Sequence, residues 1–240
     1  MLTQLKKELL NHKDIINLIY YGKVDLILVG GSRILSLDSP SSDCDIIIFT
    51  KNIGTHTQKE WTQIELPSFN NVHYKLVSIE NILKEVSEEY TQDYLQYFNL
   101  FHLCLGLTKP DTIIYQRPFV KYFLNTIQQN LKPLIYLSLS KLLEYSRAGI
   151  SLSFNRYQKS VYHYLSFYYL INNYITTSTL EYTQEQKDLL INCKTSKKIP
   201  SDFEKLFTES HTVGKYTCMY SYNDLWKELK IAYEYTNPYK

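Results

Sequence analysis

The chain has 240 residues, of which 44% are apolar and 21% charged, so it is long and apolar enough to bury a core and is not disordered throughout. Its 7 glycines and 7 prolines exclude collagen-like and low-complexity sequence, and its length suggests one large domain or two unequal ones. A net charge of +2 is too small to indicate nucleic-acid binding through overall charge.

Four cysteines, at positions 44, 104, 193 and 218, lie far apart and form no CxxC pair, so the sequence predicts neither a zinc knuckle nor a disulfide framework. The N-terminus lacks the apolar segment of a signal peptide, and no uninterrupted run approaches the roughly 20 apolar residues that span a bilayer. We therefore expect a reduced, cytoplasmic protein with no membrane partner.

The first part of the chain alternates between helix and strand patterns. Apolar residues at helical spacing predict an N-terminal helix over 2–19, broken near His12. The nearly continuous apolar run 24–29 is typical of a buried strand. A Gly-Gly-Ser turn follows, and we expect Ser32 to cap a short helix that ends at Leu37.

Two further strands and a long helical region complete the pattern. Residues 45–49 are predicted as a second buried strand and residues 72–79 as a third, with Ser78 capping a helix over 79–86. Strand patterns end near Tyr115. Beyond it, apolar residues recur at a spacing of three or four residues, which predicts helices throughout.

These patterns predict an α/β fold in two parts. A domain over 1–116 holds a short mixed sheet with flanking helices, and a helical domain over 117–240 closes one side of a cleft. We expect ligands to bind between the two.

Two aspartates lie at the start of the second strand. Residues i and i+2 of a strand point to the same face, so Asp43 and Asp45 place their carboxylates side by side, about 7 Å apart at Cα. Such a pair is suited to Mg²⁺ or Mn²⁺, because these ions bind carboxylate oxygens together with water and substrate phosphates. Cys44 points to the opposite face and is predicted to be a buried, unreactive thiol.

The Gly-Gly-Ser turn is suited to a phosphate. Without side chains, Gly30 and Gly31 let the backbone approach an anion, and Ser32 at a helix N-terminus offers its N–H and hydroxyl. Arg33 either reaches a phosphate through a charge-assisted hydrogen bond or lies solvated beside the turn. The sequence thus predicts a phosphate and a metal ion at one place.

The segment GGSRILSLDSPSSDCDIII, residues 30–48, closely resembles the signature of the polymerase beta-type nucleotidyltransferase superfamily, in which a Gly-Ser turn follows the first strand and Asp-x-Asp begins the next. It is especially similar to predicted nucleotidyltransferases of bacteria and their phages, with Ser42 before the first aspartate. The helix RYQKSVYHYLSFYYL is more loosely similar to a Lys- and Tyr-rich helix in those relatives. The resemblance covers 24–49 well and leaves about half of the chain unmatched.

The resemblance implies a Mg²⁺-dependent enzyme with the nucleotidyltransferase fold, which transfers a nucleoside monophosphate from an NTP and releases pyrophosphate; ATP is the expected NTP. It implies that Gly31 and Ser32 hold the β- and γ-phosphates, that Asp43 and Asp45 bind one or two metal ions, and that a third carboxylate on a later strand deprotonates or orients the acceptor hydroxyl. The acceptor stays open among an RNA end, a protein hydroxyl and a small molecule.

The chain departs from this pattern in the third strand. His73 stands where the third carboxylate is expected, with Glu65 and Glu80 as nearby acidic substitutes. Imidazole is a poor Mg²⁺ ligand, but a neutral histidine can accept a proton from a hydroxyl near pH 7. We hypothesise that His73 serves as the base or that only one metal ion binds.

Basic residues of the helical region give a further candidate. Lys159 and His163 lie four residues apart on one predicted helix face, where they either steady the triphosphate or acceptor or lie exposed on an amphipathic helix. The basic segment 194–200 is predicted as an exposed loop.

Two other functions are compatible with the sequence. One is a noncatalytic nucleotide- or RNA-binding protein that kept the fold and lost part of the metal site. The other is one half of a toxin–antitoxin pair.

Overall fold

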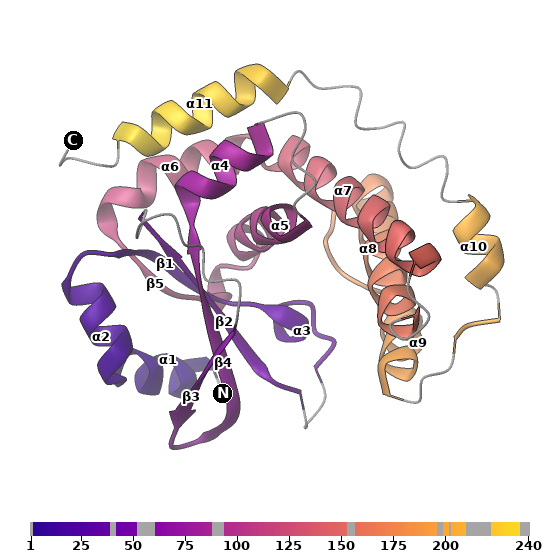
Figure 1. Ribbon diagram of the computed structural model, residues 1–240, viewed down its shortest axis with the longest axis horizontal. Helices are drawn as coiled ribbons and strands as arrows, with labels where there is room; N and C mark the ends of the chain where they lie inside the picture. The colour runs from indigo at the N-terminus through magenta and orange to yellow at the C-terminus, as the bar shows by residue number, and fades with distance from the viewer. Residues whose placement is uncertain are drawn as a thin grey trace.

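The computed structural model describes residues 2–38, 42–51, 61–87, 94–152, 157–195, 199–201, 203–209 and 222–235. Among these, five strands form one mixed sheet in the order β3-β4-β2-β1-β5 (Figure 1). The strands are β1 (Val24–Val29), β2 (Cys44–Thr50), β3 (Thr62–Leu66), β4 (Phe69–Ser78) and β5 (Ile113–Gln116). β2 and β4 run parallel, and the other neighbouring strands pair antiparallel.

Helices cover both faces of this sheet and form the rest of the described chain. They are α1 (Leu2–Asn11), α2 (Lys13–Tyr20), α3 (Gly31–Ile34), α4 (Ile79–Ser87), α5 (Tyr94–Thr108), α6 (Lys121–Gln129), α7 (Leu131–Leu152), α8 (Tyr157–Thr177), α9 (Gln184–Thr195), α10 (Phe203–Glu209) and α11 (Tyr222–Tyr235), with short 3₁₀ turns at Pro110–Thr112 and Pro118–Val120.

The central strand β2 shows how the two faces arise. Successive side chains of a strand point to opposite faces, so Ile46 and Ile48 join one buried cluster while Ile47 and Phe49 join another. The cluster of Ile46 and Ile48 includes apolar residues of α1 and α2, which lie together on one side of the sheet (Figure 1). β2 is therefore apolar on both faces, which explains its nearly continuous apolar sequence.

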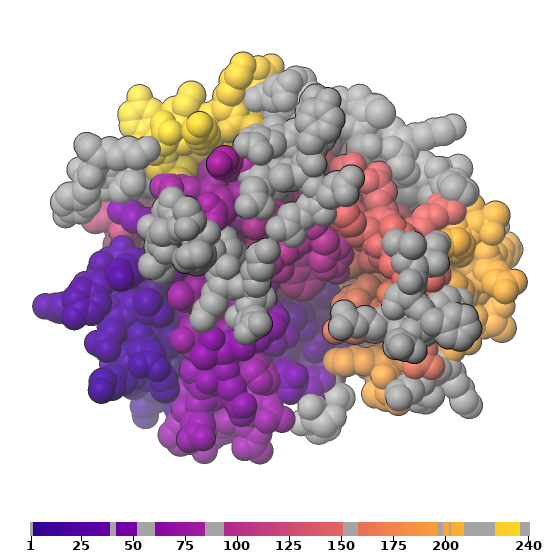
Figure 2. Space-filling model, viewed as in Figure 1, coloured from indigo at the N-terminus to yellow at the C-terminus, as the bar shows by residue number. Residues whose placement is uncertain are grey.

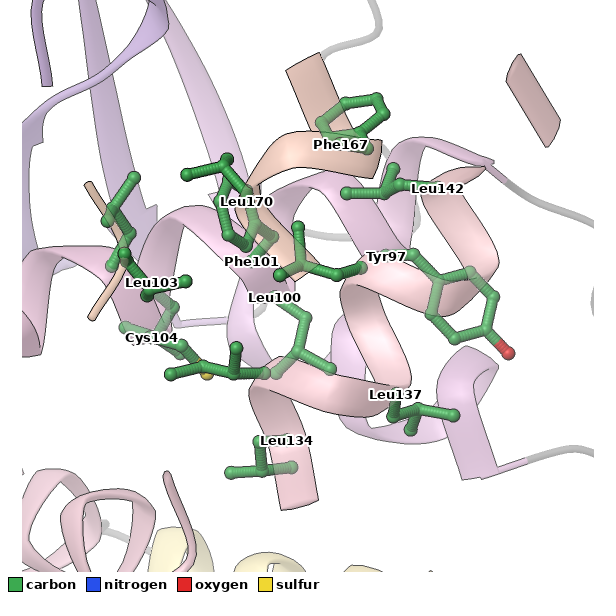
Figure 3. Close-up of a cluster of buried hydrophobic side chains, with 14 of the residues drawn as sticks. Tyr97, Leu100, Phe101, Leu103, Cys104, Leu134, Leu137, Leu142, Phe167 and Leu170 are labelled. Atoms are coloured by element: carbon green, nitrogen blue, oxygen red, sulfur yellow. The ribbon is translucent and has the colours of Figure 1, made fainter. Parts of the chain in front are cut away.

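Helix α5 covers the opposite face. It is buried over most of its length, and Gly106 lies so close to Leu28 of β1 that an added Cβ would be 2.8 Å from the leucine Cδ2. Apolar side chains of α5, α7 and α8 meet in the same cluster (Figure 3). The cluster continues into α11, so one core joins the sheet to the C-terminal helices.

A buried ion pair attaches the C-terminal helix to the sheet. Asp25 of β1 is fully buried, and its Oδ1 lies 2.7 Å from the Arg117 guanidinium. The Tyr233 hydroxyl of α11 donates to Asp25 Oδ2 at 2.9 Å. Because a buried carboxylate without partners is costly, these two contacts hold α11 and the residue after β5 against β1.

Most of the predicted elements are confirmed. The first helix is broken at His12, β1 has the predicted bounds, and all described elements after β5 are helical. The Ser78 hydroxyl accepts a hydrogen bond from the Asn81 N–H at 3.2 Å, as expected of a helix cap. The predicted exposed loop begins too early, because α9 continues through Thr195.

The structure also contains elements that the patterns did not specify, among them β3, α5, β5 and α10. The α/β class is confirmed, while the division at 116/117 stays a prediction. Within the described residues, every helix is too short or too polar to cross a bilayer.

Replacement of Phe101 in α5 by alanine tests the shared core. Phe101 is 0% exposed, so we expect the Phe101→Ala variant to lose about 3–5 kcal/mol of unfolding free energy, measured by urea denaturation. Phe119→Ala is the matched control because Phe119 is 65% exposed, and its loss should stay within about 0.5 kcal/mol. Equal losses in the two variants would contradict the assigned core.

Candidate functional site

The Gly-Gly-Ser turn and the aspartate strand come together at one end of the sheet. The Gly30 N–H donates to the main-chain oxygen of Asp45 at 2.8 Å. Gly31 has a φ of +62°, and a Cβ on it would overlap the Asp45 carboxylate. The positive φ and the close carboxylate both require glycine at position 31, because other residues disfavour this φ and any side chain would displace the carboxylate.

The prediction that Ser32 caps the short helix is wrong. α3 begins at Gly31, its N-cap is Gly30, and it ends at Ile34 rather than Leu37. Ser32 therefore lies in the first turn, where main-chain N–H groups have no partner within the helix. Among the described residues, no hydrogen bond is formed by the Ser32 N–H or hydroxyl.

A buried histidine lies beneath the turn and fixes its backbone. The Gly31 N–H donates to His102 Nε2 at 3.3 Å, and the other ring nitrogen, Nδ1, lies 2.8 Å from the Phe98 carbonyl oxygen. Because a carbonyl oxygen only accepts, Nδ1 carries the proton and the ring is neutral. Burial accordingly lowers the pKa of His102 to about 3. The Gly31 amide thus points into the protein, which leaves Ser32 as the hydrogen-bond donor of the turn.

The two aspartates differ in their surroundings. Asp43 is exposed just before β2, whereas Asp45 is partly buried. Burial raises the pKa of Asp45, and the negative charge of Asp43 raises it further. The two carboxylates therefore repel each other, and a cation between them would relieve this repulsion.

His73 lies beside Asp45. In the parallel pairing of β2 with β4, Asp45 is opposite His73, so both side chains leave the same face of the sheet. When His73 carries a proton, its positive charge lowers the pKa of Asp45. The two acidic residues named as substitutes for the third carboxylate lie on other elements. Glu65 is exposed on edge strand β3, and Glu80 lies in the first turn of α4.

Arg33 is engaged with the segment before β2. Its guanidinium donates to the main-chain oxygen of Ser42 at 3.2 Å and lies 3.5 Å from the Asp38 carboxylate. Its Nε donates to the main-chain oxygen of Asp43 at 3.4 Å. The geometry makes Arg33 a support for the aspartate segment.

The helical half contributes a lysine that the sequence analysis had placed in a solvated loop. Lys194 of α9 donates from Nζ to the Ser42 hydroxyl at 3.3 Å, and its charge lowers the pKa of Asp45. The surfaces of α8 and α9 lie beside that of the sheet in Figure 2. Lys194 thus carries a positive charge from the C-terminal half to the paired aspartates.

Lys159 and His163 lie on α8 and make no described contact with the paired aspartates. His163 is partly buried, and burial together with the charges of Lys159 and Lys194 lowers its pKa to about 4. Lys159 itself is exposed on α8. Among the described residues, the structure therefore shows no contact between Lys159 or His163 and the two aspartates.

The donor set fits a divalent cation in part. Asp43 and Asp45 supply carboxylates, the ligands Mg²⁺ prefers, and water with triphosphate oxygens would complete an octahedron. Within the described residues, no group of three or more His, Cys, Asp or Glu side chains is placed to hold a metal ion. Any cation here would depend on the two aspartates and on its substrate.

The sequence matches no protein-family model, and no curated protein matches it significantly. The resemblance to nucleotidyltransferases accordingly rests on sequence motifs, chiefly the glycine-serine turn and the paired aspartates.

A pair of glycine variants tests the close approach of Asp45 to the turn. Gly31→Ala and Gly22→Ala both place alanine at positive φ, +62° and +64°. Only the first adds an atom against Asp45, because nothing lies within 4 Å of a Cβ on Gly22. We expect each variant to lose about 1 kcal/mol from backbone strain, and Gly31→Ala to lose a further 1–3 kcal/mol or so, measured by urea denaturation. Similar losses in both would contradict the contact.

The neutral state of His102 predicts a pH dependence of stability. As pH falls below about 6.5, a histidine in the unfolded chain gains a proton while folded His102 does not, so the unfolded state binds more protons and stability decreases. This contributes roughly 1 kcal/mol of unfolding free energy per pH unit between about pH 6 and 4.

The His102→Gln variant lacks this titrating group. Its unfolding free energy, measured by urea denaturation across that range, should be lower at pH 7 but change less steeply with pH than that of the unaltered chain. Parallel pH profiles would show that His102 is protonated in the folded protein.

Proposed function

We propose that this protein is a Mg²⁺-dependent nucleotidyltransferase with a nucleotidyltransferase-type fold, which transfers a nucleoside monophosphate from an NTP, ATP being the expected one, to an acceptor hydroxyl. The acceptor is an RNA end, a protein hydroxyl or a small molecule. The observation that carries the proposal is the contact between Gly31 and the Asp45 carboxylate, which brings the phosphate-binding and metal-binding residues to one place.

The residues of the turn would hold the triphosphate. Ser32 offers a main-chain N–H and a hydroxyl that have no other described partner, at the first turn of α3. Lys194, 3.3 Å from the Ser42 hydroxyl, supplies a positive charge from the facing helix. Ser32 and Lys194 would thus bind the triphosphate beside the aspartates.

The aspartates would hold the cation and orient the reacting phosphate. When bound, Mg²⁺ neutralises charge on the phosphate and on the leaving pyrophosphate. Asp43 is exposed and Asp45 is partly buried, and both carboxylates would hold the ion. Fixed positions of this kind supply most of the rate enhancement in phosphoryl transfer.

His73 would act on the acceptor. Its register with Asp45 sets the imidazole next to the metal-binding carboxylate, on the strand where the family pattern expects an acid. A neutral imidazole there would accept the proton of the attacking hydroxyl, which then displaces pyrophosphate from the α-phosphorus.

The second candidate is a protein that binds a nucleotide or RNA without turnover. It is favoured by the finding that, within the described residues, no group of three or more His, Cys, Asp or Glu side chains is placed to hold a metal ion. In this alternative the turn and Lys194 keep their roles while transfer is absent.

Pyrophosphate release from labelled NTPs with Mg²⁺ or Mn²⁺ distinguishes the two. We expect Asp43→Asn and Asp45→Asn each to lower the rate by roughly 100-fold or more, because each removes one of the carboxylates that hold the cation. Pyrophosphate release by the purified chain alone would be compared with release in a cell extract, which supplies candidate acceptors.

Asp14→Asn is the matched control. Asp14 lies on α2, with 63% of its side chain exposed, and its replacement should leave the rate unchanged. His73→Ala should lose transfer while retaining NTP binding, and full activity of this variant would exclude His73 as the base. NTP binding without pyrophosphate release under any condition would favour the binding protein over the enzyme.

A further inference from the structure

Lys75 is a buried cation directly behind the candidate site. It follows His73 by two residues on β4, so both side chains leave the same face of the sheet, and it lies opposite Ile47. Lys75 is only 2% exposed. Lysine is almost never this buried without a charged or strongly polar partner.

The groups around the ammonium are neutral. Nζ donates to Asn99 Oδ1 of α5 at 2.6 Å and lies 5.0 Å and 5.1 Å from the ring centres of Trp61 and Phe98. Aromatic faces and an amide oxygen stabilise a cation, but they leave its charge uncompensated.

Asp45 is the carboxylate that the strand pairing brings toward Lys75. Asp45 and Lys75 are diagonal neighbours across the β2–β4 pairing, within reach of a long side chain. Burial lowers the pKa of Lys75 to about 8, and the Asp45 carboxylate opposes this shift; in turn Lys75 lowers the pKa of Asp45. Asp45 therefore lies between the buried Lys75 and the exposed Asp43 along the two strands.

We propose that the Lys75 ammonium takes the place of a second metal ion, so that the site binds one divalent cation per chain. The inference rests on the proposed function. The two site-facing residues of β4 beside the aspartates, His73 and Lys75, are basic, so this strand offers no carboxylate to a second cation. The positive charge of Lys75 lies beside Asp45 and offsets part of the negative charge of the two aspartates, so a single divalent ion is enough to neutralise the rest.

The test counts Mn²⁺ ions bound to the full chain, read from the loss of the free-ion electron paramagnetic resonance signal. The titration is run with a non-hydrolysable ATP analogue and corrected for the analogue alone. We expect one ion per chain, absent from Asp45→Asn. Two ions per chain, both absent from Asp45→Asn, would overturn the inference and leave the proposed function intact.

The Lys75→Met variant removes the charge and keeps the length of the side chain. Its Mn²⁺ affinity should rise by about tenfold or more, because a positive charge beside the ion is gone. Lys23→Met, at the exposed far end of β1, is the control and should leave the affinity unchanged. Unchanged affinity in a folded Lys75→Met variant would overturn the inference.

If Lys75→Met does not fold, the ion count of the unaltered chain decides by itself. The absence of Mn²⁺ binding in the unaltered chain, or binding that Asp43→Asn and Asp45→Asn leave intact, would overturn the proposed metal site and the inference with it.

Discussion

The close approach of the Asp45 carboxylate to Gly31 is the constraint on which the rest of the site depends. It requires a glycine with positive φ at the turn, and the Gly30 N–H bond to the Asp45 main chain holds the two segments in place. Strand pairing then sets His73 beside Asp45. One contact therefore determines where phosphate, metal and acceptor would meet.

The second requirement is a polar support inside an apolar helix. α5 packs in the main core, yet it carries Asn99 against the Lys75 ammonium and His102 against the Gly31 amide. Each polar group is buried where an unmade hydrogen bond would be costly, so both fix the residues above them. The same core extends into the C-terminal helices, which bring Lys194 to the aspartates. Sheet and helices together thus form the site.

The sequence predicts what local patterns and short spacings encode. β1 and β2 are recognisable because apolar runs end at the glycine turn and begin at the aspartates. α5 is missed because it is apolar on every side and lacks an amphipathic period, and β3 because it is a short edge strand. Lys194 and His102 are missed because only tertiary packing brings them to residues 152 and 71 positions away. Lys75 follows His73 by two residues, so strand alternation alone predicts that the two side chains lie on the same face of the sheet.

A crystal structure of the chain with Mn²⁺ and a non-hydrolysable NTP analogue, read through the anomalous signal of manganese, tests the central claim most directly. The account predicts a manganese peak about 2 Å from oxygens of both Asp43 and Asp45, with the triphosphate against Ser32. A peak away from these carboxylates, or a triphosphate bound apart from the turn, would contradict it.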